Sequence, residues 1–452
     1  MKLDNIISEP SRILQGSRIP EAYSVNEHSE IINLHAVAYP LNTQEVVDLV
    51  KYANQNDLAI ITYGANTGLA EATSAFGGEL IIDLSKMNQI IDFDLDTLTL
   101  VVDPGVTNGE VQQFVESKGY FYPPDPGAKH GSIGGNVATN AGGMRAVKYG
   151  TTREYVRKME IVLANGDVIE TGSVAIKNSS GYNLNHLFIG SEGTLGIITK
   201  VYLKVIPLPK FKQSYIAAFP SLDDAAEAVL SILRNGLDIT AVEFFERRAI
   251  AYSEQLLNKT FPSEKGVAYL LMTFDGMQEA VIQEEAQRLE KITHDHNAVE
   301  FLVLSEEDSL TAWDLRDNIL AGILTISEQE PLDYSVPVNE FVNFFKYTHE
   351  VEANSGLNFI SFGHAGDGNI HSSILRGDLT QDEWQEKKHE ILTNLYAYVS
   401  EVGGLPSAEH GIGLVKKPYF KQVMSSEYLH YLKQIKLAFD PDNRLNPGKI
   451  FD

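Results

Sequence analysis

The sequence predicts an α+β fold made of two domains. Between about residues 40 and 205, helical patterns alternate with short apolar runs that end in glycine or proline. This alternation of helical patterns and short apolar runs ends at Pro207 and Pro209. After these prolines, capped helices are interleaved with strand patterns. A chain of 452 residues is long enough for two or three domains. We therefore expect a domain boundary near 206–212.

The first part of the chain is expected to hold one clear helix, at 43–54, and several short strands. The strand candidates are apolar runs bounded by turn residues, at 58–62, 80–83, 97–102, 158–164, 167–171 and 197–205. Asn165-Gly166 separates two of these runs, and this dipeptide is a strong signal for a two-residue hairpin turn.

The second part shows helix starts and further strand patterns. Ser221 with Asp224, and Ser305 with Asp308, resemble capping boxes, so each serine is expected to open a helix. Strand candidates lie at 214–219, 267–274, 299–304, 357–363 and 370–375. This interleaving predicts one antiparallel sheet with helices on one face, and residues from about 381 onward are mainly helical.

Composition excludes several classes of function. The formal net charge of −25 makes nucleic acid an improbable partner, because an acidic surface repels phosphates. An anionic substrate would need a local positive centre, such as a metal or an arginine. The chain has no cysteine, which excludes disulfides, iron–sulfur clusters, thiolate zinc sites and cysteinyl cofactor links.

The start of the chain, MKLDNIISEP, does not resemble a signal peptide, because it carries Asp4 and Glu9 and lacks a long apolar stretch. No uninterrupted apolar run is long enough to span a bilayer. We therefore expect a cytoplasmic protein without an integral membrane segment, either free or peripheral at the inner membrane face.

Three glycine-rich stretches predict a site for a pyrophosphate. They read TYGANTGLAEATS (62–74), PPDPGAKHGSIGGNVATNAGG (123–143) and LFIGSEGTLGIIT (187–199). Glycine allows positive φ and close approach, so that consecutive amide groups can point at an anion. Each loop alone could be an ordinary turn, but three together favour a cradle. The stretches fit neither the P-loop pattern nor the Rossmann fingerprint.

A histidine pair predicts a metal site. In FISFGHAGDGNIHSSI, a turn through residues 365–370 would bring His364 and His371 together across a hairpin. Gly366 and Gly368 are expected to supply positive φ, and Asp367 can accept hydrogen bonds from amides of the loop. Alternatively, both histidines are hydrogen-bonded loop residues.

The expected third ligand lies in SAEHGIG (407–413), where Glu409 precedes His410. A carboxylate with two imidazoles suits Zn, Mn or Fe and leaves positions open for a substrate. A metal-dependent hydrolase is one alternative function for such a set. Arg316 is a candidate clamp for a substrate carboxylate. It could instead form a surface ion pair with Asp314 or Asp317.

These motifs resemble the vanillyl-alcohol-oxidase/PCMH flavoprotein superfamily over essentially the whole chain. YGANTGL resembles its pyrophosphate loop, although Ala65, Asn66, Ala70 and Glu71 stand where glycine or small residues are usual. GHAGDGNIH, SAEHGIG and DPDNRLNPGK resemble signatures of FAD-linked D-2-hydroxyacid dehydrogenases within it. That group includes D-lactate and D-2-hydroxyglutarate dehydrogenases and the flavin subunit of glycolate oxidase.

The resemblance implies three parts and a set of site residues. The parts are a PCMH-type FAD-binding domain (1–208), a substrate- and metal-binding cap domain (209–415) and a helical C-terminal segment that returns to the FAD site (416–452). His364, His371 and Glu409 would bind the metal, His410 would be the catalytic base, and Arg316 would bind substrate. The FAD contacts would be Gly64, Ala65, Asn66, Thr67, Gly68, Leu69, Pro124, Asp125, Ser132, Ile133, Gly134, Gly135, Asn136, Thr139, Asn140, Gly142, Glu192, Gly193, Ile197, Ile198 and Asn446.

The implied reaction is oxidation of a D-2-hydroxy acid to the 2-keto acid, with hydride transfer to N5 of a non-covalent FAD. Relatives that take a dicarboxylate have extra donors where this chain has Leu320 and Ser373, and no lysine lies near Tyr334. D-lactate is therefore favoured over D-2-hydroxyglutarate and glycolate. A non-catalytic flavin-binding subunit is a further alternative. The electron acceptor could be a quinone, an electron-transfer protein or oxygen, and an oligomer is compatible with the sequence.

Overall fold

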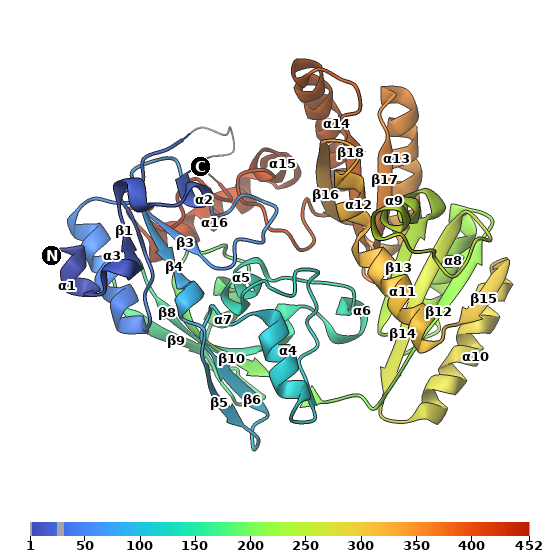
Figure 1. Ribbon diagram of the computed structural model, residues 1–452, viewed down its shortest axis with the longest axis horizontal. Coiled ribbons are helices and arrows are strands. Elements are labelled where there is room, and N and C mark those ends of the chain that lie inside the picture. Colours follow the sequence, from blue (N-terminus) through green and yellow to red (C-terminus); the bar gives the residue numbers. More distant parts are fainter. Residues whose placement is uncertain (1, 25–30, 452) are drawn as a thin grey trace. The chain divides into compact units, whose positions relative to one another are not determined.

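The computed structural model describes residues 2–24 and 31–451 (Figure 1). The chain forms two compact units, each of which draws on separate stretches of sequence. The first unit comprises Met1–Gly142, Gly150–Leu208 and Glu409–Asp452. The second comprises Gly143–Tyr149 and Pro209–Ala408. The division into domains at residues 208 and 415 stays a prediction.

Two sheets form the framework of the first unit. A four-stranded sheet has the order β1 (Ile13–Leu14), β2 (Ala36–Ala38), β4 (Leu80–Asp83) and β3 (Ile60–Tyr63), and its last three strands are parallel. An antiparallel five-stranded sheet has the order β5 (Ile90–Asp94), β6 (Thr99–Val102), β10 (Ile197–Lys204), β8 (Val156–Val162) and β9 (Val168–Gly172). The short strands β7 (Tyr120–Phe121) and β11 (Ile206–Pro207) pair separately. The predicted strands of this part are confirmed.

Helix α3 (Thr43–Gln55) covers the parallel sheet and contributes to the main core of the first unit. It begins after Asn42, whose side chain accepts a hydrogen bond from the Glu45 amide. Its apolar face buries Val46, Leu49 and Val50 against both sheets. The other helices of this unit are α1 (Leu3–Ile6), α2 (Glu21–Ser24), α4 (Asn108–Glu116), α5 (Ile133–Thr139), α7 (Leu184–Phe188), α15 (Lys417–Val423) and α16 (Ser426–Phe439).

The Asn165-Gly166 hairpin is confirmed. Strands β8 and β9 pair in register around it, and Gly166 has φ +83°, which suits a residue without a Cβ atom.

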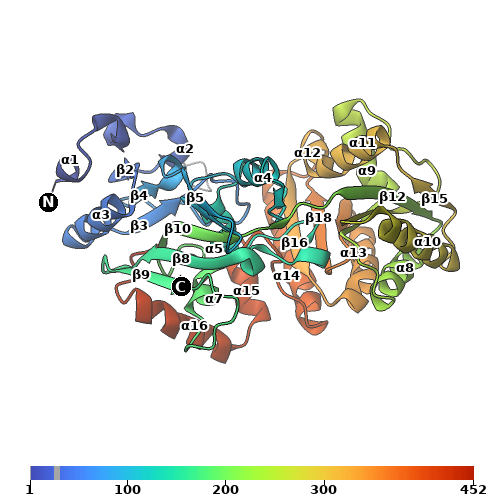
Figure 2. The same cartoon turned by 90° about the horizontal axis from the view of Figure 1, so that it is seen from below.

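The C-terminal stretch packs onto the first unit. Helix α16 lies beside α7 (Figure 2), where the rings of Phe188 and Phe439 are 5.1 Å apart. The buried ammonium of Lys436 donates hydrogen bonds to the Thr194 carbonyl and to Asp440. Beyond α16, the Ile60 amide donates to the carbonyl of Arg444, so the end of the chain extends the edge of β3.

The second unit is built on one antiparallel sheet of seven strands. Its order is β15 (Glu300–Val303), β12 (Phe211–Phe219), β14 (Ala268–Gly276), β13 (Ala241–Glu246), β17 (Phe359–His364), β18 (Asn369–Leu375) and β16 (Gln329–Ser335). The predicted antiparallel sheet is therefore confirmed. The helices are α6 (Ala146–Tyr149), α8 (Leu222–Arg234), α9 (Arg247–Leu257), α10 (Glu279–Asp295), α11 (Glu306–Asp317), α12 (Ile319–Leu324), α13 (Phe341–Ser355) and α14 (Gln381–Glu401).

Helices cover both faces of this sheet, so the expectation of helices on one face is wrong. On one face, α9, α11 and α12 pack against Phe245 and Phe362. On the other face, α8, α10 and α13 pack against the sheet, and Phe244 contacts Phe341 and Phe345. Successive residues of a strand point to opposite faces, so the apolar pair Phe244-Phe245 requires cover on both sides.

The predicted helix starts are confirmed, but two strands were missed. The Ser221 and Ser305 hydroxyls accept hydrogen bonds from the amides three residues later, at the starts of α8 and α11. The missed strands are β13 and β16, the first with two glutamates and the second with Pro331 and Asp333. Neither pattern resembles an apolar strand. Pro331 is tolerated because β16 lies at the edge of the sheet.

Within the described residues, no helix is both long enough and apolar enough to cross a membrane.

Candidate functional site

The glycine-rich stretches of the first unit converge on one cavity. Its empty volume is about 950 Å³, open mouth included. The lining comes from the ends of β3, β4 and β6, the three loops, the SAEHGIG segment and the C-terminal stretch. Its residues are Thr62, Tyr63, Gly64, Ala65, Asn66, Thr67, Gly68, Ala70, Ala72, Thr73, Leu84, Pro104, Ser132, Gly134, Gly135, Asn136, Ala138, Thr139, Glu192, Gly193, Gly196, Ile198, His410 and Asn446.

Close backbone packing joins the first two loops. The Ser132 hydroxyl caps α5 by accepting a hydrogen bond from the Gly135 amide, and it lies 3.3 Å from the Ala65 amide. A Cβ atom on Gly64 would stand 2.4 Å from this hydroxyl, and one on Gly134 would stand 2.8 Å from Cβ of Pro104. Glycine is therefore required at position 64, where the two loops meet, and at position 134, where the second loop meets the residue Pro104 after β6.

Glu192 joins the third loop to the segment after His410. Its carboxylate accepts hydrogen bonds from the amides of Ile412 (2.7 Å) and Gly413 (2.8 Å). Its carbonyl accepts a third from the side chain of Asn446 (3.0 Å). Burial raises the pKa of the Glu192 carboxyl above its usual range, although the two amides oppose this shift. Three distant parts of the sequence thus meet at one buried residue.

Most of the predicted FAD contacts line this cavity. Those that do are Gly64, Ala65, Asn66, Thr67, Gly68, Ser132, Gly134, Gly135, Asn136, Thr139, Glu192, Gly193, Ile198 and Asn446. Leu69, Pro124, Asp125, Ile133, Asn140, Gly142 and Ile197 are not among its lining residues. Ile133 and Ile197, the first residues of α5 and β10, are completely buried. The part that each residue plays in holding the flavin stays a prediction.

Several lining residues are absent from the predicted FAD contacts, and two of them, Leu84 and Pro104, lie outside the three glycine-rich stretches. Thr62 and Tyr63 end β3, Leu84 follows β4 and Pro104 follows β6. A strand that runs directly into a ligand loop was the available signal for the first two. Leu84 and Pro104 lack such a signal. They reach the cavity because strand pairing brings the ends of β4 and β6 to it.

The histidine hairpin of the second unit is formed by β17 and β18. His364 pairs with Asn369, and His371 pairs with Phe362, so both imidazoles lie on the same face of the sheet. Their ring centroids are 5.2 Å apart, with the ring planes at 89°. The predicted convergence of the two histidines is therefore confirmed.

The turn of this hairpin differs in one detail from the expectation. Gly368 has φ +78°, but Gly366 does not adopt positive φ. Gly366 is instead packed closely, because a Cβ atom there would stand 2.7 Å from the side chain of Val147. The carboxylate of Asp367 accepts a hydrogen bond from the Asn369 amide, as predicted.

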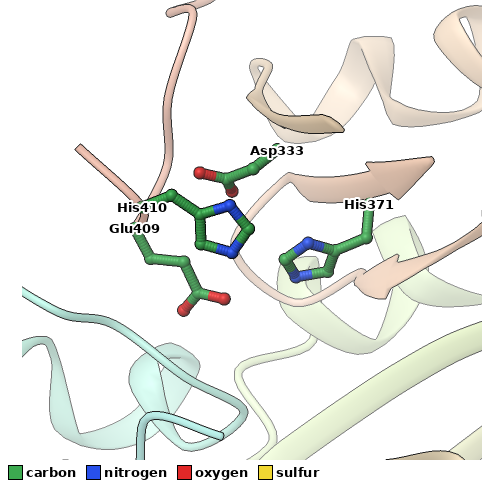
Figure 3. Close-up of side chains that lie close together, drawn as sticks. All are labelled: Asp333, His371, Glu409 and His410. Atoms are coloured by element: carbon green, nitrogen blue, oxygen red, sulfur yellow. The ribbon is translucent and has the colours of Figure 1, made fainter. Parts of the chain in front are cut away.

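Asp333, His371, Glu409 and His410 gather in a group that could hold a metal ion (Figure 3). Each offers one ligand atom, and these atoms lie within 4.8 Å of one another. Asp333 is directly opposite His371 in the pairing of β16 with β18. Its carboxylate accepts hydrogen bonds from the Ser407 hydroxyl (2.9 Å) and the Ala408 amide (3.2 Å).

Asp333 therefore anchors the stretch that leads directly into Glu409 and His410. Its other oxygen accepts a hydrogen bond from the Asn369 side chain (2.8 Å). Asp333 is completely buried, and sequence reasoning missed it. β16 also carries Gln329, Glu330 and Pro331, so no local pattern marked Asp333 as a buried carboxylate.

His364 and Arg316 meet at a second buried carboxylate. Glu243 on β13 is 1 % exposed and lies opposite His364 on β17. One oxygen of Glu243 is 2.6 Å from Nδ1 of His364, and the other is 2.5 Å from Nη2 of Arg316. Arg316 is buried, and besides Glu243 its guanidinium forms a longer ion pair with Asp317, at 3.9 Å.

The buried position of Glu243 is electrostatically compensated. Burial raises the pKa of this carboxyl, but the charge of Arg316 and the contact with His364 outweigh that effect. Its pKa therefore lies below the usual range, and the group is ionised. The ligand and substrate-binding roles of His364, His371, Glu409 and Arg316 stay predictions.

The donor set fits a divalent metal ion. Imidazole nitrogens with carboxylate oxygens are the ligands that Zn, Mn and Fe accept, whereas Mg and Ca prefer oxygen alone. Asp333 belongs to the group and restrains it by accepting a hydrogen bond from the backbone of Ala408. His364, a predicted ligand, is not a member of that group, and Glu243 restrains its imidazole. Such restraint of the ligands is a common property of metal sites.

Two sequence families match this chain. A family described as FAD binding domain matches residues 34–172, and one described as FAD linked oxidases, C-terminal domain, matches residues 208–450.

Curated relatives align over nearly the whole chain. D-lactate dehydrogenase of Anaerostipes hadrus is 38% identical over 98% of this chain and 95% of its own length. Glycolate oxidase subunit GlcD of Bacillus subtilis is 36% identical over 92% and 88%. D-2-hydroxyglutarate dehydrogenase of Stutzerimonas stutzeri is 34% identical over 98% and 97%.

Solved structures show the same fold. Substrate-bound p-cresol methylhydroxylase superposes with a TM-score of 0.81 at 18% identity, covering 100% of this chain and 96% of that structure. The 4-ethylphenol oxidase of Gulosibacter chungangensis superposes with a TM-score of 0.76 at 18% identity, covering 99% and 97%. These likenesses confirm the predicted PCMH-type FAD-binding fold.

Proposed function

Because the chain belongs to the family of FAD-linked oxidases and is an FAD-dependent oxidoreductase, we propose that it oxidises a D-2-hydroxy acid to the 2-keto acid with the help of a divalent metal. The observation that carries this proposal is the group of Asp333, His371, Glu409 and His410. It combines ligands for a metal with an imidazole that can accept a proton. The relatives that align end to end are named for three hydroxy acids of this class.

FAD would be held non-covalently in the cavity of the first unit. The chain has no cysteine, and residues 62–74 contain no histidine to which a flavin could be attached. Backbone amides of the glycine-rich loops supply donors for a pyrophosphate without adding positive charge. Bound FAD supplies the electron acceptor for the hydride, and the protein supplies position and charge.

The metal would be held by His364, His371 and Glu409, and Asp333 would be a further carboxylate near the metal. A metal bound there supplies a positive centre that lowers the pKa of a coordinated hydroxyl group. In this strongly acidic protein it would also attract the carboxylate of the substrate.

His410 would take the proton of the substrate hydroxyl. An imidazole suits this role because its ordinary pKa lies near neutral pH. His410 lines the cavity of the glycine-rich loops. The hydrogen bond from the Ala408 amide to Asp333 restrains the backbone two residues before His410. Arg316 would orient the substrate carboxylate, since a guanidinium can donate two parallel hydrogen bonds to it.

A small monocarboxylate such as D-lactate is the favoured substrate. Leu320 packs against the apolar cluster that contains Phe362, and Ser373 is buried in β18. Neither side chain offers a charge partner for a second carboxylate. D-2-hydroxyglutarate and glycolate remain second candidates, because relatives of 34% and 36% identity are named for them.

The decisive experiment is anaerobic mixing of the purified flavoprotein with D- and L-lactate, D- and L-2-hydroxyglutarate and glycolate. Flavin absorbance should bleach with D-lactate faster than with the other acids. Bleaching by D-2-hydroxyglutarate or glycolate alone would show that this acid, and not D-lactate, is the substrate. A flavoprotein that none of these acids reduces would defeat the proposal in favour of a non-catalytic flavin subunit. A colourless protein that hydrolyses a nucleotide would favour the hydrolase.

A further inference from the structure

Glu243 has no role in the chemistry proposed above, yet it contacts two residues of that chemistry. It is 1 % exposed in the middle of β13. One oxygen lies 2.6 Å from Nδ1 of His364, and the other lies 2.5 Å from Nη2 of Arg316. A single buried carboxylate thus contacts both the candidate metal ligand and the candidate substrate clamp.

The short contact determines which nitrogen of His364 carries the proton. The other oxygen of Glu243 lies 2.5 Å from the guanidinium of Arg316, the contact that a carboxylate makes with a cation, and a carboxylate only accepts hydrogen bonds. Nδ1 at 2.6 Å is therefore the donor. Arg316 Nη2 lies farther from Nδ1, at 3.3 Å, and a guanidinium has no lone pair to receive that proton. In neutral His364 the lone pair is therefore on Nε2, where a metal can bind it.

We propose that Glu243 is a positioning residue that fixes the metal-binding tautomer of His364 and the orientation of Arg316. This inference rests on the proposed function, because it assumes that His364 binds the metal. Arg316 supplies the positive charge that balances Glu243, so His364 need not be protonated to stabilise the buried carboxylate. The register of β13 with β17 places Glu243 and His364 directly opposite each other.

Replacing Glu243 by glutamine allows only one of its two contacts, with His364 or with Arg316, to be kept. An amide has one accepting oxygen and one donating nitrogen. If its oxygen faces His364, its amino group opposes the guanidinium of Arg316. If its oxygen faces Arg316, its amino group donates to Nδ1 and shifts the imidazole proton to Nε2. Either orientation loses one contact, and the second removes the metal-binding lone pair.

The same strand offers a matched control. Glu246 is 9 % exposed and also contacts a histidine and an arginine, with 2.7 Å to His349 Nε2 and 2.7 Å to Arg248 Nε. It is three residues from Glu243, so its side chain points to the opposite face of the sheet. Glu246→Gln therefore removes a chemically similar interaction away from the candidate metal ligands.

The test measures zinc affinity by competition with a chromophoric chelator, using FAD-loaded wild type, Glu243→Gln and Glu246→Gln. We expect Glu243→Gln to bind Zn²⁺ about 10–100-fold more weakly than wild type, and Glu246→Gln to bind it within about twofold. The KM for D-lactate of the zinc-saturated Glu243→Gln variant should rise more than its kcat falls. FAD content and melting temperature report whether each variant is folded.

Equal zinc affinity in wild type and Glu243→Gln would overturn the inference while leaving the proposed function intact. Equal weakening in both variants would also overturn it, because a general structural effect would then suffice. A wild-type protein that binds no zinc, manganese or iron would defeat the proposed metal dependence itself.

If Glu243→Gln does not fold, ¹⁵N NMR of histidine-labelled, metal-free wild type can show which nitrogen of His364 carries the proton. His364, assigned with a His364→Gln variant, must carry its proton on Nδ1, and a proton on Nε2 would overturn the inference.

Discussion

Asp333 on β16 lies directly opposite His371 on β18, and its buried carboxylate also accepts hydrogen bonds from Ser407 and Ala408. One side chain thereby connects the histidine hairpin to the stretch that continues into Glu409 and His410. This relationship explains how donors from three separate parts of the sequence gather in one group.

The first prediction concerns Asp333→Asn. An amide can accept on one side only, so its amino group would oppose either the donors of Ser407 and Ala408 or the side chain of Asn369. We expect a loss of stability on the order of 1.5–3 kcal/mol, the usual worth of a hydrogen bond to a charged group. Metal content should fall as well. Melting temperature and metal analysis measure both effects, and the exposed Asp378→Asn is the control.

The second prediction concerns His410→Ala. If His410 is the base, flavin reduction by D-lactate should slow by about 10²–10⁴-fold, the usual contribution of a general base. FAD binding should survive, because many other residues line the cavity. Stopped-flow absorbance measures the rate, and His389→Ala on the exposed side of α14 is the control. An unchanged rate would remove His410 from the mechanism.

The third prediction concerns Asn446→Ala. The Asn446 side chain accepts a hydrogen bond from the Thr62 amide (2.9 Å) and donates one to the Glu192 carbonyl (3.0 Å). Its loss leaves a buried amide without a partner, which costs about 1–3 kcal/mol. We expect weaker FAD binding and a lower melting temperature, whereas the exposed Asn178→Ala should change neither. Titration of the apoprotein with FAD, followed by flavin fluorescence, measures the affinity.

The fourth prediction concerns removal of the metal. Dialysis against a chelator should abolish reduction of the flavin by D-lactate but leave the flavin absorbance spectrum, since the residues described as lining the cavity do not include His364, His371 or Glu409. Adding Zn²⁺, Mn²⁺ or Fe²⁺ singly should then restore the rate with one of them and identify the metal. Full activity in a protein shown to be metal-free would contradict the prediction.

The fifth prediction concerns pH and His35. Burial lowers the pKa of this imidazole from 6.5, and its ring contacts the Tyr52 hydroxyl at 2.8 Å. The unfolded chain therefore takes up a proton at a higher pH than the folded protein does. The contribution of His35 to stability is complete above pH 6.5 and declines as the pH falls toward the lowered pKa. Melting temperatures measured across this range should decline less steeply for His35→Gln than for wild type.

Much of this architecture could be predicted from local sequence. Apolar runs and turn residues identified six strands of the first unit but not the strands β1, β2, β5, β7 and β11. Serine caps identified the starts of α8 and α11. The missed strands β13 and β16 carry buried acids where a strand pattern would have apolar residues. Local patterns failed at these strands because Glu243 faces His364 and Asp333 faces His371 on the neighbouring strands, and neither acid faces water.

The loops, the histidine hairpin and the SAEHGIG segment could be identified from local sequence, because each is a short stretch whose chemistry depends on neighbouring residues. The contacts of Glu243 with His364 and Arg316, and of Asp333 with His371 and Ala408, became apparent in the folded chain alone. These contacts depend on the order and register of strands that are far apart in the chain. Many pairings of such strands are compatible with the local pattern, and packing of the whole sheet selects one.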